Sequence, residues 1–130
     1  MTRPLLVLVS GHPGSGKTTL ARALGDELHL PHLNRDRISS GMWRTDPALI
    51  DDPRQPWEMF AETIERYLAA GVSLVADQTL YRGMEPEITT RLVPLGAMVN
   101  VHCRCSDAYD RWRAKIVDLP QNTPATIAAL

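Results

Sequence analysis

The 130-residue chain predicts a three-layer α/β fold, in which helices cover both faces of a mainly parallel sheet of about four strands. Apolar runs at residues 5–9, 72–76 and 97–101 alternate with longer segments in which apolar residues recur at helical spacing. The first run is unbroken, which is typical of a strand buried on both faces. The length suits one hydrophobic core, so we expect a single domain over residues 1–130.

The first expected strand, at residues 5–9, leads into a glycine-rich loop and then a helix. Leu20, Leu24 and Leu28 are spaced four apart and predict the buried face of that helix. The loop between them fits G-x-x-x-x-G-K-[ST], and strand, loop and helix form the context in which this motif binds phosphate. Its residues are Gly11, His12, Pro13, Gly14, Ser15, Gly16, Lys17 and Thr18.

The residue types in this loop suit a nucleoside triphosphate. Glycine allows unusual backbone dihedrals and close approach to a ligand, so that successive N–H groups can surround phosphate oxygens. Lys17 can reach the β- and γ-phosphates, the Thr18 hydroxyl can bind Mg²⁺, and Thr19 completes the expected nucleotide-binding segment. ATP and Mg²⁺ are therefore the predicted cofactors. The alternative is a glycine turn before a helix whose Lys17 and Thr18 face solvent.

The middle of the chain predicts a short strand at 32–34, a short helix at 38–43, a loop at 46–56 and a second long helix that ends at Gly71. Five apolar residues at helical spacing mark the buried face of that helix: Trp57, Phe60, Ala61, Ile64 and Leu68.

The rest of the chain predicts a strand at 72–76, a helix that begins near Pro86, and a strand at 97–101 that could continue to Cys105. Ser106 then caps an expected helix at about 107–116. Residues after 119 are rich in helix-breaking types and predict no further strand, so a fifth strand is expected to be missing.

Two carboxylates follow expected strands, at the sheet edge where parallel α/β proteins bind ligands. Asp77 comes directly after the strand at 72–76 and could hold Mg²⁺ near Thr18, although Asp is also common in strand-to-helix turns. Asp36 closes the short strand at 32–34 and could accept the proton of an attacking hydroxyl. The alternatives for Asp36 are a helix cap or an ion pair with Arg35 or Arg37.

Three segments, 11–21, 33–37 and 75–79, together resemble the P-loop kinases related to polynucleotide 5′-kinase, a group often labelled AAA-family ATPase. Zeta-type toxins and chloramphenicol phosphotransferase are more distant members of this group. The resemblance runs from Leu5 to about Lys115. It implies that Asp36 is the general base and that Asp77 supports the metal and acceptor site.

The resemblance also implies a basic lid at the end of the chain. Arg111 and Lys115 fall at the lid positions, Arg113 competes with them, and a solvated helix face is the alternative. Three departures are visible. The segment Asp77-Gln78-Thr79-Leu80 stands where the group usually has Asp-x-Thr-Asn. Ser39 stands where polynucleotide kinases carry an acceptor-binding Arg, a role that Arg37 could take, and the chain ends before the fifth strand of its relatives.

Composition and charge limit the kinds of partner and the compartment that we expect for this protein. A net charge of −1 does not favour long nucleic acid, no signal or transmembrane segment is visible, and the two cysteines are expected as free thiols, so we expect a cytoplasmic protein. The leading hypothesis is a kinase that acts on a small molecule, a nucleotide or a short nucleic-acid end. The alternatives are a nucleotide-binding module without transferase activity and, ranked last, a hydrolase coupled to conformational change.

Overall fold

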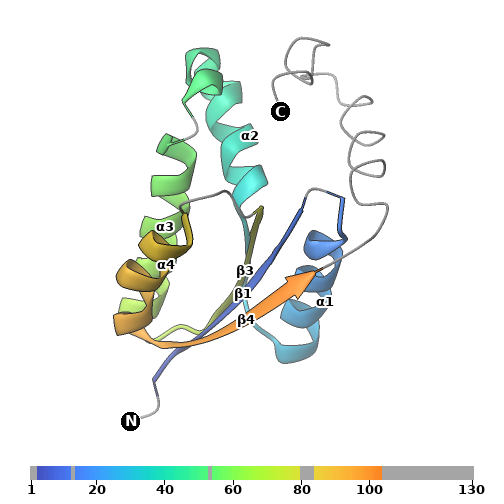
Figure 1. Cartoon of the computed structure of the whole chain (residues 1–130), viewed down its shortest axis with the longest axis vertical. Helices are drawn as coiled ribbons and strands as arrows, with labels where there is room; N and C mark the ends of the chain where they lie inside the picture. The colour runs from blue at the N-terminus through green and yellow to red at the C-terminus, as the bar shows by residue number, and fades with distance from the viewer. Residues whose placement is uncertain (1–2, 13, 53, 80–83, 104–130) are drawn as a thin grey trace.

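The computed structural model describes residues 3–12, 14–52, 54–79 and 84–103. Within them, four strands form one sheet in the order β2-β3-β1-β4, and every pair is parallel (Figure 1). The prediction of a parallel four-stranded sheet is confirmed. The strands are β1 (Leu5–Gly11), β2 (His32–Asn34), β3 (Leu74–Thr79) and β4 (Ala97–Cys103).

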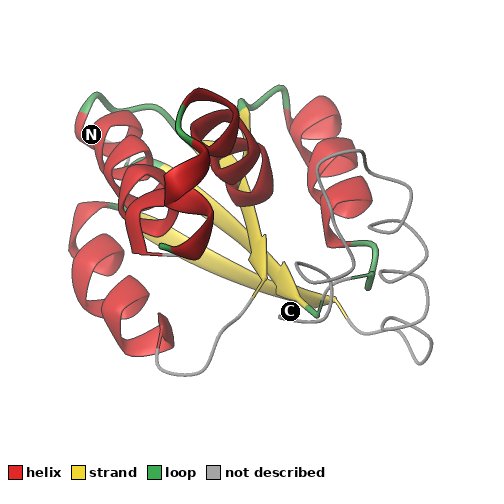
Figure 2. Cartoon of the chain, turned by 90° about the horizontal axis from the view of Figure 1, so that it is seen from above, coloured by secondary structure: helices red, strands yellow, loops and turns green. Residues whose placement is uncertain are grey.

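Helices lie on both faces of this sheet (Figures 1 and 2). Helix α1 (Lys17–Leu28) covers one face, and α2 (Arg35–Thr45), α3 (Arg54–Ala69) and α4 (Met84–Leu92) lie on the other. Two short 3₁₀ helices, η1 (Pro47–Asp51) and η2 (Val93–Leu95), join these elements. Among the described helices, none is long and apolar enough to span a bilayer.

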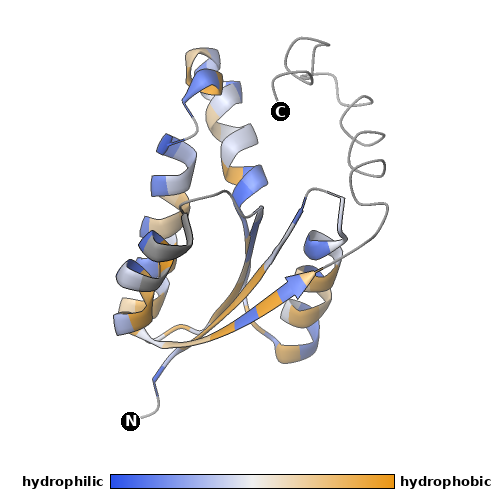
Figure 3. Cartoon of the chain, viewed as in Figure 1, coloured by the Kyte–Doolittle hydropathy of each residue, from blue (hydrophilic) through white to orange (hydrophobic). Residues whose placement is uncertain are grey.

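The core has two parts, one on each face of the sheet. The larger part lies under α3 and contains the five apolar residues predicted for its buried face, all between 0% and 3% exposed. The smaller part lies under α1, where Val7, Val9 and Val75 pack against Ala21. Figure 3 shows the apolar residues along the strands and the inner sides of the helices. The sequence pattern therefore predicted the larger part of the core correctly.

The predicted buried face of α1 is wrong by about one residue. Leu20 and Leu28 are 36% and 47% exposed, whereas Ala21 and Gly25 are buried and Leu24 is half-buried. A Cβ atom at Gly25 would lie 3.1 Å from the Leu30 carbonyl oxygen, a tight contact that a larger residue could make only if the neighbouring backbone moved by a few tenths of an ångström. Small residues let α1 lie close to the chain beneath it. Counting leucines misses a face made of alanine and glycine.

Helix α2 begins three residues earlier than predicted, at Arg35 rather than at 38. The Asn34 side chain caps it, because Oδ1 accepts a hydrogen bond from the Arg37 backbone N–H at 2.7 Å. As a result, Asp36 does not close the second strand, as we had expected, but lies in the first turn of the helix.

The segment 46–56 is not a continuous loop as predicted, because η1 and the first turn of α3 lie within it. The Asp46 and Asp52 carboxylates accept hydrogen bonds from the backbone N–H groups two residues later, each at 3.1 Å. These aspartates start helical turns rather than interrupt them.

Strand β3 spans Leu74–Thr79 instead of the predicted 72–76. The end of α3 takes up the earlier residues: Gly71 has a φ of 78°, and the Val72 N–H donates to the Tyr67 carbonyl at 2.8 Å. Asp77 is therefore inside the strand, opposite Val9 of β1 and Asn34 of β2. The expected helix at 107–116 and the missing fifth strand lie outside the described residues.

Candidate active site

The glycine loop joins the end of β1 to the start of α1, as predicted. Gly11 has no room for a side chain, because a Cβ atom there would lie 2.6 Å from Ser15 Oγ and 2.7 Å from the Cys103 carbonyl oxygen. Gly16 has space around it but a φ of +87°, a backbone conformation that favours glycine. The two glycines are thus required for different reasons, close approach in one case and backbone conformation in the other.

Lys17, the first residue of α1, is only 5% exposed. Its charge acts on the Cys103 thiol at the end of β4. Burial raises the pKa of this thiol, the Lys17 ammonium lowers it, and the Asp77 carboxylate raises it further. Lys17 and Asp77 therefore lie close enough to Cys103 to act on the same thiol. A cation beside the loop provides the charge that polyphosphate binding requires.

Asp77 is fully buried, with an exposed fraction of 0%, and three side chains contact its carboxylate. Oδ1 accepts hydrogen bonds from the Thr18 hydroxyl at 3.1 Å and from the Asn34 amide Nδ2 at 2.6 Å. Oδ2 contacts His32 Nε2. Because Thr18 comes from the glycine loop and the other two residues from β2, Asp77 connects three parts of the fold.

Thr18 and Asp77 form the oxygen pair predicted for Mg²⁺. Mg²⁺ in nucleotide enzymes is held by one or two protein oxygens together with phosphates and water, rather than by a cage of protein ligands. In the described ranges no group of three or more His, Cys, Asp or Glu side chains forms such a cage. The Thr18 hydroxyl and the Asp77 carboxylate are therefore suited to hold Mg²⁺ together with phosphates and water.

Asp36 lies in the first turn of α2, with a side chain that is 59% exposed. One carboxylate oxygen is 3.4 Å from the guanidinium of Arg35, so the ion pair considered as an alternative is present. The other alternative, a helix cap, is wrong, because Asn34 fills that position. Asp36 is open to solvent at the end of α2 nearest to β2.

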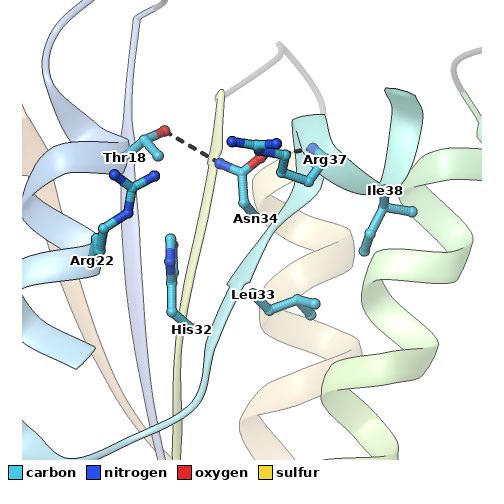
Figure 4. A pocket seen from close by; sticks show the side chains of 7 residues that line it. All are labelled: Thr18, Arg22, His32, Leu33, Asn34, Arg37 and Ile38. Atoms are coloured by element: carbon cyan, nitrogen blue, oxygen red, sulfur yellow. Dashed lines mark hydrogen bonds between the residues drawn. The ribbon is translucent and has the colours of Figure 1, made fainter. Parts of the chain in front are cut away.

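A cavity of ≈ 320 Å³ opens beside Thr18 (Figure 4). Arg22 from α1 and Arg37 from α2 line it, and no carboxylate among the described residues does so. Guanidinium groups bind phosphate and carboxylate in two-point contacts. The remaining lining residues are His32, Leu33, Asn34 and Ile38. The cavity is therefore suited to an anionic group.

The structure brings Lys17, Thr18 and Asp77 together, and it places Asp36 on the adjoining helix. Trp57 is a core residue with 1% exposure, as predicted for the buried face of its helix. Pro13 and the lid candidates Arg111, Arg113 and Lys115 lie outside the described residues.

His32 and Asn34 are site residues that the sequence analysis missed. Both lie in β2, two residues apart, so their side chains leave the strand on the same face. Two polar residues on one face of a strand could have indicated a site. Their role depends on the pairing of Asn34 with Asp77 across β2 and β3, and this pairing cannot be deduced from a three-residue strand alone.

A glycine loop that ends in a buried Lys, between a parallel strand and a helix, defines a P-loop nucleotide-binding protein. The chain belongs to the AAA domain family, which matches residues 6–122. A search of curated proteins gave no match.

Solved structures of P-loop kinases share this fold. A candidate kinase from Chloroflexus aurantiacus is 25% identical, with a TM-score of 0.77 over 98% of this chain and 75% of that one. A chain of the Pnkp1/Rnl/Hen1 RNA repair complex is 18% identical, with a TM-score of 0.74 over 98% of this chain and 43% of that one. A gluconokinase from Sinorhizobium meliloti is 20% identical, with a TM-score of 0.59 over 99% of this chain and 74% of that one.

Proposed function

We propose that this single-domain protein is a cytoplasmic kinase that transfers the γ-phosphoryl group of Mg·ATP to a hydroxyl group of a small molecule, a nucleotide or a nucleic-acid end. The observation that carries the proposal is the 3.1 Å hydrogen bond between Thr18 and the buried Asp77, which joins the phosphate loop to the neighbouring strand. Such a pair is what a Mg·nucleotide site needs beside the loop.

In this proposal the loop residues from Gly11 to Thr19 surround the triphosphate with backbone N–H groups, and Lys17 neutralises charge on its β- and γ-phosphates. Thr18 and Asp77 would hold Mg²⁺, which supplies positive charge to the phosphate oxygens. These residues position the γ-phosphoryl group and stabilise the charge that spreads over it during transfer.

Asp36 is the proposed general base. It would accept the proton of the acceptor hydroxyl as the oxygen attacks phosphorus and the bond to the β-phosphate oxygen breaks. Its exposure leaves it accessible to an acceptor. Arg111, with Arg113 or Lys115 as alternatives, would supply the lid cation over the transferred group.

The acceptor is proposed to bind in the cavity beside Thr18. Arg22 and Arg37 favour an acceptor that carries a phosphate or carboxylate group, and Arg37 would take the role expected of an Arg at position 39. The name of one similar protein, a gluconokinase, indicates a hydroxy acid as acceptor, and the RNA repair complex indicates a nucleic-acid end.

The test is a γ-phosphoryl transfer screen with labelled ATP over nucleosides, 5′-hydroxyl oligonucleotides, sugar acids and hydroxylated antibiotics. We expect transfer to one class, and a loss of about 10²- to 10⁴-fold in kcat for Asp36→Asn, the range for removal of a general base. Arg44→Gln, an exposed change at the far end of the same helix, is the control. Transfer that is unchanged in Asp36→Asn would remove Asp36 from this role.

A second candidate function is nucleotide binding without transfer. The pairing of Asp36 with Arg35 favours it, because a carboxylate oxygen that is engaged by a guanidinium is less available to an acceptor hydroxyl. Mg·ATP binding with no transfer to any acceptor in the screen would select this candidate.

A further inference from the structure

The side chain of Asn34 connects the two halves of the proposed site. At one end, Oδ1 accepts a hydrogen bond from the Arg37 N–H at 2.7 Å and caps α2. At the other end, Nδ2 donates to Asp77 Oδ1 at 2.6 Å and to Thr18 Oγ1 at 3.2 Å (Figure 4 shows the contacts with Thr18 and Arg37). One planar group thus joins the start of α2 to both proposed Mg²⁺ residues.

These contacts need both halves of a side-chain amide. A carboxylate at position 34 could cap the helix but has no hydrogen to donate to Asp77. A serine hydroxyl could also cap the helix, yet it is one atom shorter and ends close to its own backbone. Asparagine carries the acceptor and the donor on one rigid unit, so the two sets of contacts are held at a fixed separation.

This connection ends in the helical turn that carries Asp36. Asp36 lies two residues after Asn34 in the first turn of α2, and in the described part of the chain its one ion pair is with the adjacent Arg35, on the same helix. An ion pair within one turn adds no contact between the helix and the sheet. Helix α2 packs on α3 and β3, and the Asn34 amide adds a direct hydrogen bond from the start of α2 to Asp77, a fully buried residue of β3.

We propose that Asn34 is a positioning residue that sets the distance and direction between the general base Asp36 and the metal site formed by Thr18 and Asp77. The inference rests on the proposed function. A displacement of about 1 Å in a reacting group can cost about a hundredfold in rate, so a loosened connection should lower kcat more than nucleotide affinity.

The kinetic test uses Asn34→Ser, which preserves the capping chemistry, is uncharged and removes the connection to Asp77. We expect kcat to fall about 10- to 100-fold, KM for Mg·ATP to stay within about twofold, and the thermal midpoint to stay near that of the wild type. Asp46→Ser is a matched control, because it replaces the capping side chain of η1 away from the site. A kcat of Asn34→Ser within twofold of the wild type would overturn the inference.

A second readout does not depend on turnover. Hydrogen exchange at the Arg37 amide reports how firmly the start of α2 is held. We expect Mg·ADP to slow this exchange about tenfold in the wild type, because ordering Thr18 and Asp77 also orders Asn34, but to leave it unchanged in Asn34→Ser. Equal slowing in both proteins, or none in the wild type, would contradict the inference. If the wild type transfers no phosphoryl group, the proposed function fails and this exchange result alone decides the role of Asn34.

Discussion

The two faces of the sheet differ sharply where β3 ends. On the face toward α1, Val75 belongs to the smaller core, and Asp77 two residues later joins a polar cluster with Thr18 and β2. On the opposite face, Leu74 and Ala76 pack in the larger core under α3. Because successive side chains of a strand point to opposite faces, β3 contributes residues both to the polar cluster and to the larger core. The site and the core should therefore respond separately to substitution.

The largest expected effect is on the apolar face. Phe60 is 2% exposed in the centre of the α3 side, and Phe60→Ala should lower the free energy of unfolding by about 3–5 kcal/mol through lost burial and a residual cavity. The matched control is Met59→Ala on the same helix, where the side chain is 46% exposed and little change is expected. Urea unfolding measures both variants.

If the site and the core respond separately to substitution, Phe60→Ala should leave the nucleotide affinity of the folded protein unchanged. Nucleotide binding by Phe60→Ala, measured at a temperature where the protein is still folded, should match that of the wild type. Weakened binding in the folded variant would show that the core under α3 also shapes the site.

Gln78 is a polar residue on the apolar face, so its substitution tests the difference between the two faces of the sheet. It is 1% exposed, and in the described structure neither amide atom has a hydrogen-bond partner. An unsatisfied buried polar group costs about 1–3 kcal/mol, so Gln78→Leu should raise the free energy of unfolding by about 1 kcal/mol. Gln78→Asn, which retains the amide, should not. A fall in stability for Gln78→Leu would mean that the amide has a partner in solution.

The smallest expected effect is electrostatic and lies on the outer side of the apolar face. Arg91 of α4 donates hydrogen bonds to Glu58 and Glu65 of α3 and lies 5.6 Å from the Trp57 ring centroid. The Arg91 hydrogen bond holds the pKa of Glu58 below its usual value of 4.5. A lowered carboxyl pKa stabilises the fold above the unfolded value, and this contribution is lost as the pH falls through the folded value.

Glu58→Gln should therefore lower the thermal midpoint by about 1–2 °C at neutral pH, a size typical of exposed ion pairs. The difference from the wild type should shrink as the pH falls below 4.5 and vanish once the Glu58 carboxyl is protonated in the folded protein. Glu62→Gln on the same helix is the control, since no ion pair of Glu62 occurs among the described residues. A difference that persists at acid pH would show that the contribution is not electrostatic.

The sequence predicted the features that depend on local pattern. The run at 5–9, the loop through Thr18 and the apolar face from Trp57 to Leu68 each carry their signal in neighbouring residues, and the parallel sheet follows from their alternation. Asp77 could be predicted because a carboxylate beside a buried strand is conspicuous once a phosphate loop is known.

The missed features depend on contacts between distant segments. Asn34 and His32 gain their roles only because β2 pairs with β3 in a register that brings them to Asp77. The cap by Asn34 moves the start of α2 and takes Asp36 from the strand into the helix. The α1 face was missed because close approach at Gly25 favours small residues over leucine. Pairing register and backbone proximity are not visible in residue spacing.

Calorimetric titration of Mg·ATP into the purified protein, Lys17→Ala and Asp77→Asn measures directly whether the glycine loop and Asp77 bind Mg·nucleotide. We expect one nucleotide site in the wild type, affinity at least about tenfold weaker in Lys17→Ala, and loss of the Mg²⁺ dependence of binding in Asp77→Asn. No heat with the wild type, or equal binding by the wild type and Lys17→Ala, would contradict this expectation.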